Sequence, residues 1–198
     1  IGKANAVKLS DGRRQVVHVT IAGADDIPID RNSDLYRNLK QALHQFGDPY
    51  QPLQLAVREL MVLILVAKVR ILSDYLWESV EVKIRSALLD VFSFERRELG
   101  QSVFLGEAIA TMQKIPGVAY VDVDILNSVS ESEAIKPKEL VEKLKKPLSQ
   151  QQQKPENYIR VNLARINPDA TDFDKRIQPA QLAILSPEIA DTLILQQL

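Results

Sequence analysis

The chain has 198 residues, of which 45% are hydrophobic and 26% are charged, a composition typical of one globular domain or two small ones. Its 25 basic and 26 acidic residues leave a net charge of -1, so no basic excess is present to neutralise the phosphates of a nucleic acid. The absence of cysteine excludes disulfides, thiolate metal sites and a cysteine nucleophile. The longest apolar run, residues 60–67, is much shorter than the roughly 20 residues that span a bilayer.

The N-terminal 31 residues are predicted to be extended and to form the end of an upstream β-rich region. Residues 15–21 are rich in β-branched side chains and lie between two glycine-containing turns, as expected for a strand. The chain starts at Ile1 and carries no secretory signal pattern. We therefore expect a fragment of a longer polypeptide made in the cytoplasm, with the partners of this strand further upstream.

Residues 32–126 are predicted to form an α+β core domain. Its first helix is expected to be capped by Asn32 or Ser33 and to run to Phe46, with Gly47 as a left-handed stop.

Two strands are predicted next, over residues 53–58 and 60–71, with a hairpin or bulge near Glu59. The second run is apolar on both faces at its start and alternates later. This pattern predicts a strand covered on both sides at one end and half exposed at the other.

A second helix is expected to start at the Ser73-Asp74 cap, a shorter third helix to end at Pro116-Gly117, and a strand to follow over residues 118–125. The predicted fold class is α+β, with helices packed on one face of a small antiparallel or mixed sheet and with extended N- and C-terminal β segments.

Residues 127–157 are predicted to be a polar linker that contains one charged helix, over residues 137–146, and a glutamine-rich stretch. Residues 158–198 are predicted to be a C-terminal β-rich extension, with strands within residues 158–164, 177–185 and 191–195.

The sequence offers little that indicates chemistry. His18 and His44 are the only histidines, and neither has a partner at metal-ligand spacing. Asp122 and Asp124 alternate along a predicted strand, where a solvated strand face is favoured over a carboxylate pair or a calcium site. Phosphate-binding and nucleophile motifs are absent. We expect no metal, no organic cofactor, no small-molecule substrate and no catalytic activity.

The turn between the second and third helices is the candidate site, as a subunit interface. It combines aromatic side chains with arginines, which are enriched at interface hot spots. The alternative left open is that Phe92 and Phe104 are buried and the arginines only solvate the turn. Replacing both arginines by glutamate is expected to leave the fold intact and to block assembly. The candidate interface residues are Phe92, Phe94, Arg96, Arg97 and Phe104.

Several stretches, taken in order, resemble a known family. They are Phe46-Gly47-Asp48-Pro49-Tyr50-Gln51-Pro52, Tyr75-Leu76-Trp77-Glu78-Ser79-Val80-Glu81, Ala87-Leu88-Leu89-Asp90-Val91-Phe92-Ser93-Phe94-Glu95-Arg96-Arg97, Leu99-Gly100-Gln101 and Ile115-Pro116-Gly117-Val118-Ala119-Tyr120-Val121-Asp122. Together they resemble the C-terminal part of baseplate assembly proteins related to the phage baseplate J-like family. The likeness covers about residues 23–126 and returns at residues 178–182 and 185–187.

The resemblance implies a structural wedge-type component of a contractile phage tail or tail-derived injection system, with no catalytic residues to carry over. Its partners would be other baseplate subunits and copies of itself, assembled into a particle without membrane insertion. Two other interpretations stay open: a small ligand-binding or regulatory α+β module of a larger protein, and a hydrolase using Asp122 and Asp124.

Overall fold

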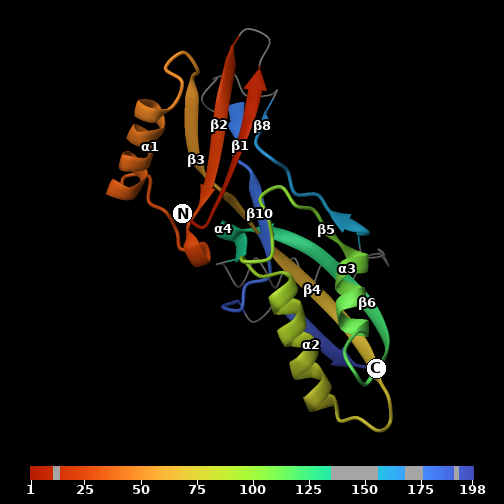
Figure 1. Ribbon diagram of the computed structural model, residues 1–198. Coiled ribbons are helices and arrows are strands. Elements are labelled where there is room, and N and C mark those ends of the chain that lie inside the picture. The colour runs from red at the N-terminus through yellow and green to blue at the C-terminus, as the bar shows by residue number, and fades with distance from the viewer. Residues whose placement is uncertain (11–13, 135–155, 168–175, 190–191) are drawn as a thin grey trace. The chain divides into compact units, whose positions relative to one another are not determined.

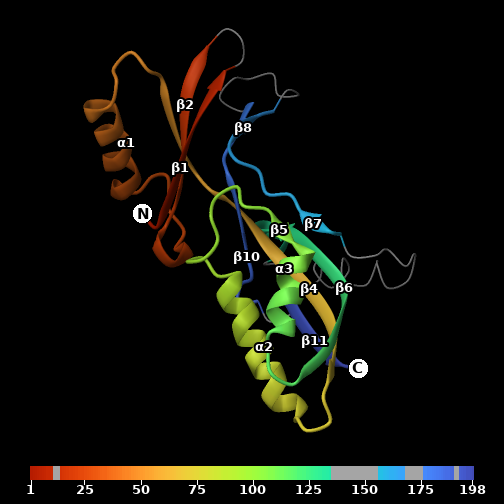
Figure 2. The same cartoon turned by 45° about the vertical axis from the view of Figure 1, so that its right-hand side comes forward.

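The computed structural model describes residues 1–10, 14–134, 156–167, 176–189 and 192–198. It confirms the predicted α+β class, with helices and mixed sheets alternating along the chain (Figures 1 and 2). The helical elements are η1 (Ala24–Asp26), α1 (Asp34–Phe46), α2 (Trp77–Val91), α3 (Leu105–Gln113) and α4 (Glu131–Ala134). The strands are β1 (Lys3–Ser10), β2 (Gln15–Ala22), β3 (Leu53–Val57), β4 (Glu59–Ile71), β5 (Val103–Phe104), β6 (Val118–Ser130), β7 (Tyr158–Ile159), β8 (Arg165–Ile166), β9 (Ile177–Gln178), β10 (Gln181–Ile184) and β11 (Leu193–Gln197).

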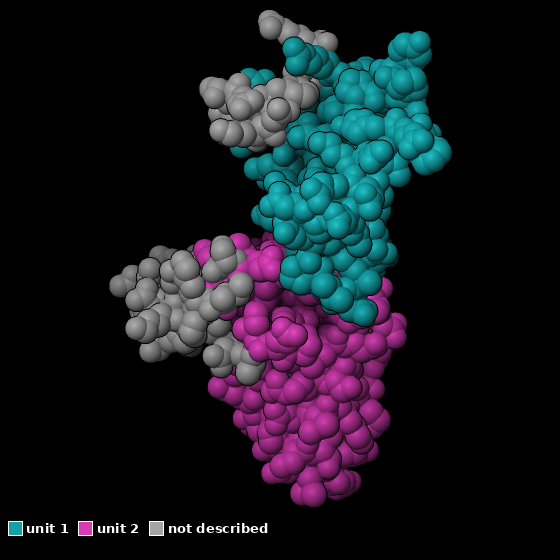
Figure 3. Space-filling model, turned by 90° about the vertical axis from the view of Figure 1, so that its left-hand side faces the viewer, with its two compact units in different colours: residues 1–59, 98–101, 161–182 teal, residues 60–97, 102–160, 183–198 magenta. Residues whose placement is uncertain are grey.

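The chain divides into two compact units, each built from three separate segments (Figure 3). Unit 1 contains residues 1–59, 98–101 and 161–182, and unit 2 contains residues 60–97, 102–160 and 183–198. This grouping differs from the predicted segments, since residues 32–59 fall with residues 1–31. The reason is strand pairing, because β3 pairs with β2.

Unit 1 is organised on the sheet β1-β2-β3, in which β1 is antiparallel and β3 is parallel to β2. The predicted strand at residues 15–21 is confirmed as β2. The expectation that its partners lie upstream of the chain is wrong, because both lie within it. Strand β1 alternates half-buried and exposed residues, several of them alanine, lysine or serine, so it lacks the β-branched enrichment that marked β2.

Helix α1 follows the predicted boundaries closely. The Ser33 hydroxyl accepts a hydrogen bond from the Tyr36 amide at 3.3 Å, which makes Ser33 the N-cap. Gly47 ends the helix but is not left-handed, since its φ is -84°. Glycine is needed there for a different reason, because a Cβ would lie 2.4 Å from the Leu43 carbonyl oxygen. The Tyr36 hydroxyl donates to the Leu55 carbonyl at 2.6 Å and so attaches α1 to β3.

Unit 2 is organised around the long strand β4, with β6 antiparallel and β11 parallel to it. Residues 62–65 are buried, whereas Arg70 near the other end is exposed, which confirms the predicted change from two covered faces to one. The described residues around Glu59 form neither the expected hairpin nor the expected bulge. Strands β3 and β4 belong to different sheets, and the Arg58 amide between them donates to the Ile21 carbonyl at 2.9 Å.

Helices α2 and α3 contact each other and pack on the β6 and β11 strands of this sheet (Figures 1 and 2). The buried residues of α2 are Val80, Ile84 and Leu88, as its periodicity predicts. Its N-cap is Leu76, two to three residues later than the predicted Ser73-Asp74 cap, because Leu72 and Tyr75 close a turn first. Trp77, the first residue of α2, is half-buried.

Strand β6 is longer than predicted. Residues 127–130, assigned from sequence to a polar linker, continue the ladder with β4 as far as the pair Met61 and Ser130. A bulge at Asp124 changes the alternation, so that Leu126 and Val129 are buried after Val121 and Val123. The predicted helix at 137–146 and the glutamine-rich stretch lie outside the described residues.

The C-terminal β segments are confirmed as β7 to β11. The first of them is shorter than expected, and the last, Leu193–Gln197, lies two residues later than predicted. Strand β7 ends at Ile159, and the next paired residues are Arg165 and Ile166 of β8.

Candidate functional site

The predicted interface turn begins where α2 ends and is attached internally at that point. Phe92 is the C-cap of α2 and is buried, and its carbonyl accepts a hydrogen bond from the Leu185 amide at 3.0 Å. Phe94 is half-buried. The Phe92 side chain is therefore a core residue of unit 2, as one of the two interpretations from sequence has it.

Arg97 is an internal residue and not a surface cation. Its side chain is only 1% exposed, and its Nη1 lies 3.2 and 3.1 Å from the two carboxylate oxygens of Glu107 on α3. Nη2 donates to the Ser102 carbonyl at 2.8 Å, and the guanidinium lies 5.6 Å from the centre of the Phe92 ring. Burial lowers the pKa of Arg97. The nearby Glu107 carboxylate partly offsets this decrease, and an arginine remains charged at neutral pH in any case.

Arg96 is directed to solvent and pairs with Asp90 at 2.9 Å, with 61% and 56% of the two side chains exposed. An exposed pair of this kind contributes at most about 1 kcal/mol to stability. The adjacent arginines of the turn thus have opposite environments. Arg96 remains accessible to a partner, whereas Arg97 holds α3 to the end of α2.

The accessible aromatic residue of the turn is Phe104, which stacks on Tyr158. The ring centres are 6.1 Å apart with an interplanar angle of 29°. Phe104 is 56% exposed and Tyr158 is 49% exposed. Strands β5 and β7 pair Phe104 with Tyr158, and the Leu105 amide donates to the Asn157 carbonyl at 3.0 Å beside them. We call Phe104 and Tyr158 the aromatic platform. Tyr158 was not predicted, because no local pattern signals a pairing across more than 50 residues.

The titratable side chains that were considered for chemistry do not converge. In the described part of the chain, no group of three or more His, Asp or Glu side chains is arranged to hold a metal ion. The Asp124 carboxylate pairs with Lys68 at 3.0 Å, and Asp122 is exposed. His18 is buried in β2, whereas His44 is exposed on α1.

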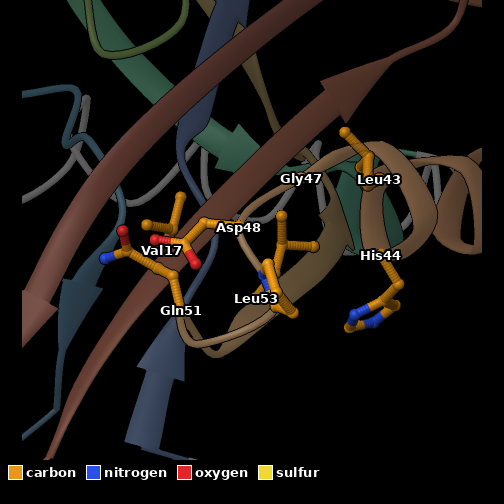
Figure 4. Close-up of a pocket in the computed structure, with 8 residues that line it drawn as sticks. Val17, Leu43, His44, Gly47, Asp48, Gln51 and Leu53 are labelled. Carbon is orange, nitrogen blue, oxygen red and sulfur yellow. The ribbon is translucent and has the colours of Figure 1, made fainter.

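A hollow of about 380 Å³ lies between the end of α1 and strands β2 and β3 (Figure 4). Its polar side chains do not face one common point. His44 lies apart from Asp48 and Gln51 (Figure 4), and the Asp48 carboxylate accepts a hydrogen bond from the Tyr50 amide at 2.9 Å within its own turn. A site for a small ligand ordinarily has several converging polar groups, so this hollow gives no support to the ligand-binding interpretation.

Comparison with known proteins gives one family match. Residues 1–56 match the model of the Baseplate J-like central domain. This confirms the predicted resemblance to the baseplate J-like family and indicates a structural component of a phage baseplate. It also corrects the placement, because the matched part is the central domain at residues 1–56 and overlaps the expected region only at 23–56. No curated protein matches the chain.

Proposed function

We propose that this baseplate J-like chain is a wedge-type structural subunit of a contractile phage tail or tail-derived injection system. The family match at residues 1–56 is the observation that carries the proposal. In this role the chain acts by protein–protein assembly and not by catalysis. Its partners are other baseplate subunits and copies of itself, and it requires neither nucleic acid nor insertion into a membrane. None of the described helices is long and apolar enough to cross a membrane.

The aromatic platform supports a contact with a neighbouring subunit. Large aromatic side chains are enriched at interface hot spots, and they bind most strongly where a partner removes them from water. Phe104 and Tyr158 are half exposed and held in one orientation by the pairing of β5 with β7. The residue-level proposal therefore differs from the one made from sequence: Phe104 and Arg96 stay as contact residues, Tyr158 is added, and Phe92 and Arg97 become their internal support.

The test is a pair of substitutions with a matched control in the same unit. Phe104→Ser with Tyr158→Ser should leave unit 2 folded and reduce incorporation of the chain into assembled particles at least tenfold. Tyr120→Ser, on strand β6 and 52% exposed, should incorporate like the unchanged chain. Folding is checked by circular dichroism, and incorporation by quantifying the chain in purified particles. Normal incorporation of the folded double variant would show that the contact lies elsewhere.

A further inference from the structure

The turn between α1 and β3, residues 46–52, presents two aromatic side chains to water. Phe46 is 83% exposed and Tyr50 is 94% exposed, the two highest values among the exposed large hydrophobic residues of the described chain. Neither side chain therefore contributes much to the packing of unit 1. Folding alone gives no reason to place two such residues in one turn, and apolar surface gathered in this way marks an interaction site.

The backbone of this turn is fixed by hydrogen bonds. The Asp48 carboxylate accepts a hydrogen bond from the Tyr50 amide at 2.9 Å, and the Asp48 carbonyl accepts one from the Gln51 amide at 3.1 Å. The Pro52 carbonyl accepts a hydrogen bond from the Val17 amide of β2 at 2.9 Å, which attaches the turn to the sheet. Because the turn is already ordered, a partner that binds Tyr50 does not have to order it, and the entropic cost of association is lower.

The hollow at the end of α1 opens beside the same turn (Figure 4). Its apolar lining consists of Val17, Leu43, Pro49 and Leu53. Its volume of about 380 Å³ lies within the range of roughly 300–1,000 Å³ that is usual for ligand pockets. The hollow therefore has room for one tyrosine side chain.

The polar groups of the hollow suit the hydroxyl of a tyrosine. A buried tyrosine packs its ring against apolar atoms and keeps its hydroxyl hydrogen-bonded. His44, Asp48 and Gln51 line the hollow and carry nitrogen or oxygen acceptors. These side chains are spread along the hollow, which is unfavourable for a small polar ligand but sufficient for a single hydroxyl group.

The surface around the turn is therefore self-complementary, since it has both a protruding tyrosine and a hollow that fits one. A two-fold symmetric contact uses the same surface on both copies, so that surface must supply what it also accepts. A partner of another kind would need only one of the two features. Among the described residues that line the hollow, Asp48 is acidic and His44 is basic, so two copies do not meet with an excess of like charge.

We propose that two copies of this chain associate through the turn at residues 46–52, with Tyr50 of each copy inserted into the hollow of the other and Phe46 packed beside it. The proposal gives a location to the contact between copies that the proposed function includes, and it rests on that function in this respect. It does not involve the aromatic platform, which lies in unit 2.

The expected association is weak in solution. A phenylalanine or tyrosine removes about 150–250 Å² from water when it is buried, so the four aromatic side chains of two turns account for about 600–1,000 Å². The lining of the two hollows adds to this area, which brings the contact to the lower limit of specific interfaces, about 1,000–1,200 Å². A particle that holds copies side by side raises their local concentration and strengthens such a contact.

Sedimentation equilibrium of the full chain tests the association. The mean mass should rise above the 22.3 kDa of one chain as the concentration approaches about 1 mM. Tyr50→Ser should weaken the association at least tenfold and keep the circular dichroism spectrum of the unchanged chain, because the side chain is exposed. Leu35→Ser, 51% exposed in the first turn of the same helix, is the matched control and should associate like the unchanged chain. A mean mass that stays at one chain, or equal association in the two variants, would overturn the proposal.

Photo-cross-linking identifies the partner and the position of Tyr50. The photoreactive residue p-benzoylphenylalanine replaces Tyr50 in an equal mixture of isotope-labelled and unlabelled chains. Cross-links between a labelled and an unlabelled chain are expected at the peptides that carry Val17, Leu43 or Leu53. Cross-links confined to one chain, or formed at other surfaces of the second copy, would contradict the proposal.

The same photoreactive variant in purified particles separates a second copy from other subunits. Cross-links between two copies of the chain are the expected result, and cross-links exclusively to a different subunit would show that the partner is another protein. Failure of these tests does not bear on the baseplate role, which is tested by incorporation of the chain and of its Phe104→Ser and Tyr158→Ser double variant into particles.

Discussion

At the scale of single residues, the adjacent arginines of the turn after α2 separate what sequence can predict from what it cannot. A mixed-sign run such as Glu95-Arg96-Arg97-Glu98 is typical of a solvated turn or of a salt-bridged interface, and Arg96 conforms to the solvated turn. Arg97 does not, because Glu107 and the Ser102 carbonyl provide buried partners after the chain has turned back on itself. No spacing in the sequence distinguishes the two side chains.

Arg97→Glu should destabilise unit 2 by about 3–5 kcal/mol, because it buries a carboxylate against Glu107 and removes the original ion pair. From sequence, replacing both arginines by glutamate was expected to leave the fold intact. The buried position of Arg97 leads us to expect the opposite for that residue. Arg96→Glu is the matched control and should change the unfolding free energy by about 1 kcal/mol or less. Trp77, the only tryptophan, lies in unit 2 and reports its urea unfolding by fluorescence. Equal unfolding midpoints for the two variants would contradict the internal role of Arg97.

At the scale of elements, periodicity and capping predicted β2, α1, β3, β4 and α3 well, because each has a local signal that packing then uses. The signals failed where pairing decided the structure. Residues 127–130 are polar except for Val129, yet they extend β6, because β4 pairs with them as far as Ser130. The start of α2 moved past Ser73-Asp74 because a tighter turn preceded it, and no side chain caps the helix at Leu76.

Residues 98–101 belong to unit 1, although the segments before and after them belong to unit 2, and their conformation depends on a glycine. Gly100 has a φ of +78°, its amide donates to the Gln181 carbonyl at 2.8 Å, and an added Cβ would lie 2.4 Å from Leu163 Cδ2. Gly100→Ala should therefore lower stability by about 1–2 kcal/mol, through backbone strain and displacement of Leu163.

Gly106 is the control with the opposite sign. It lies within α3, and nothing is within 4 Å of an added Cβ. Gly106→Ala should raise stability by about 0.5–1 kcal/mol, because alanine is the better helix former. Calorimetric melting of the two variants checks both signs, and a melting temperature for Gly100→Ala equal to or above that of the unchanged chain would refute the requirement for glycine.

At the scale of the whole molecule, sequence predicted the α+β class and the baseplate J-like resemblance but not how the segments combine. Each unit draws on three separate stretches, and the family match covers residues 1–56 alone. Local patterns cannot reveal such an arrangement, because the contacts that define it join residues such as Thr20 and Ala180, 160 positions apart. The aromatic platform was predicted only in part for the same reason. Phe104 was predicted from sequence, and its stacking partner Tyr158 was not.

The central claim is that the chain is built into a baseplate, and its location in the particle tests this most directly. An epitope-tagged full-length protein that contains this chain would replace the natural copy, and purified particles would be labelled with gold-conjugated antibody for electron microscopy. The account predicts label at one end of the tail in most particles, and no complete tails when the gene is deleted. Complete, functional tails without the protein, or particles that carry no label although the tagged protein is expressed, would contradict it.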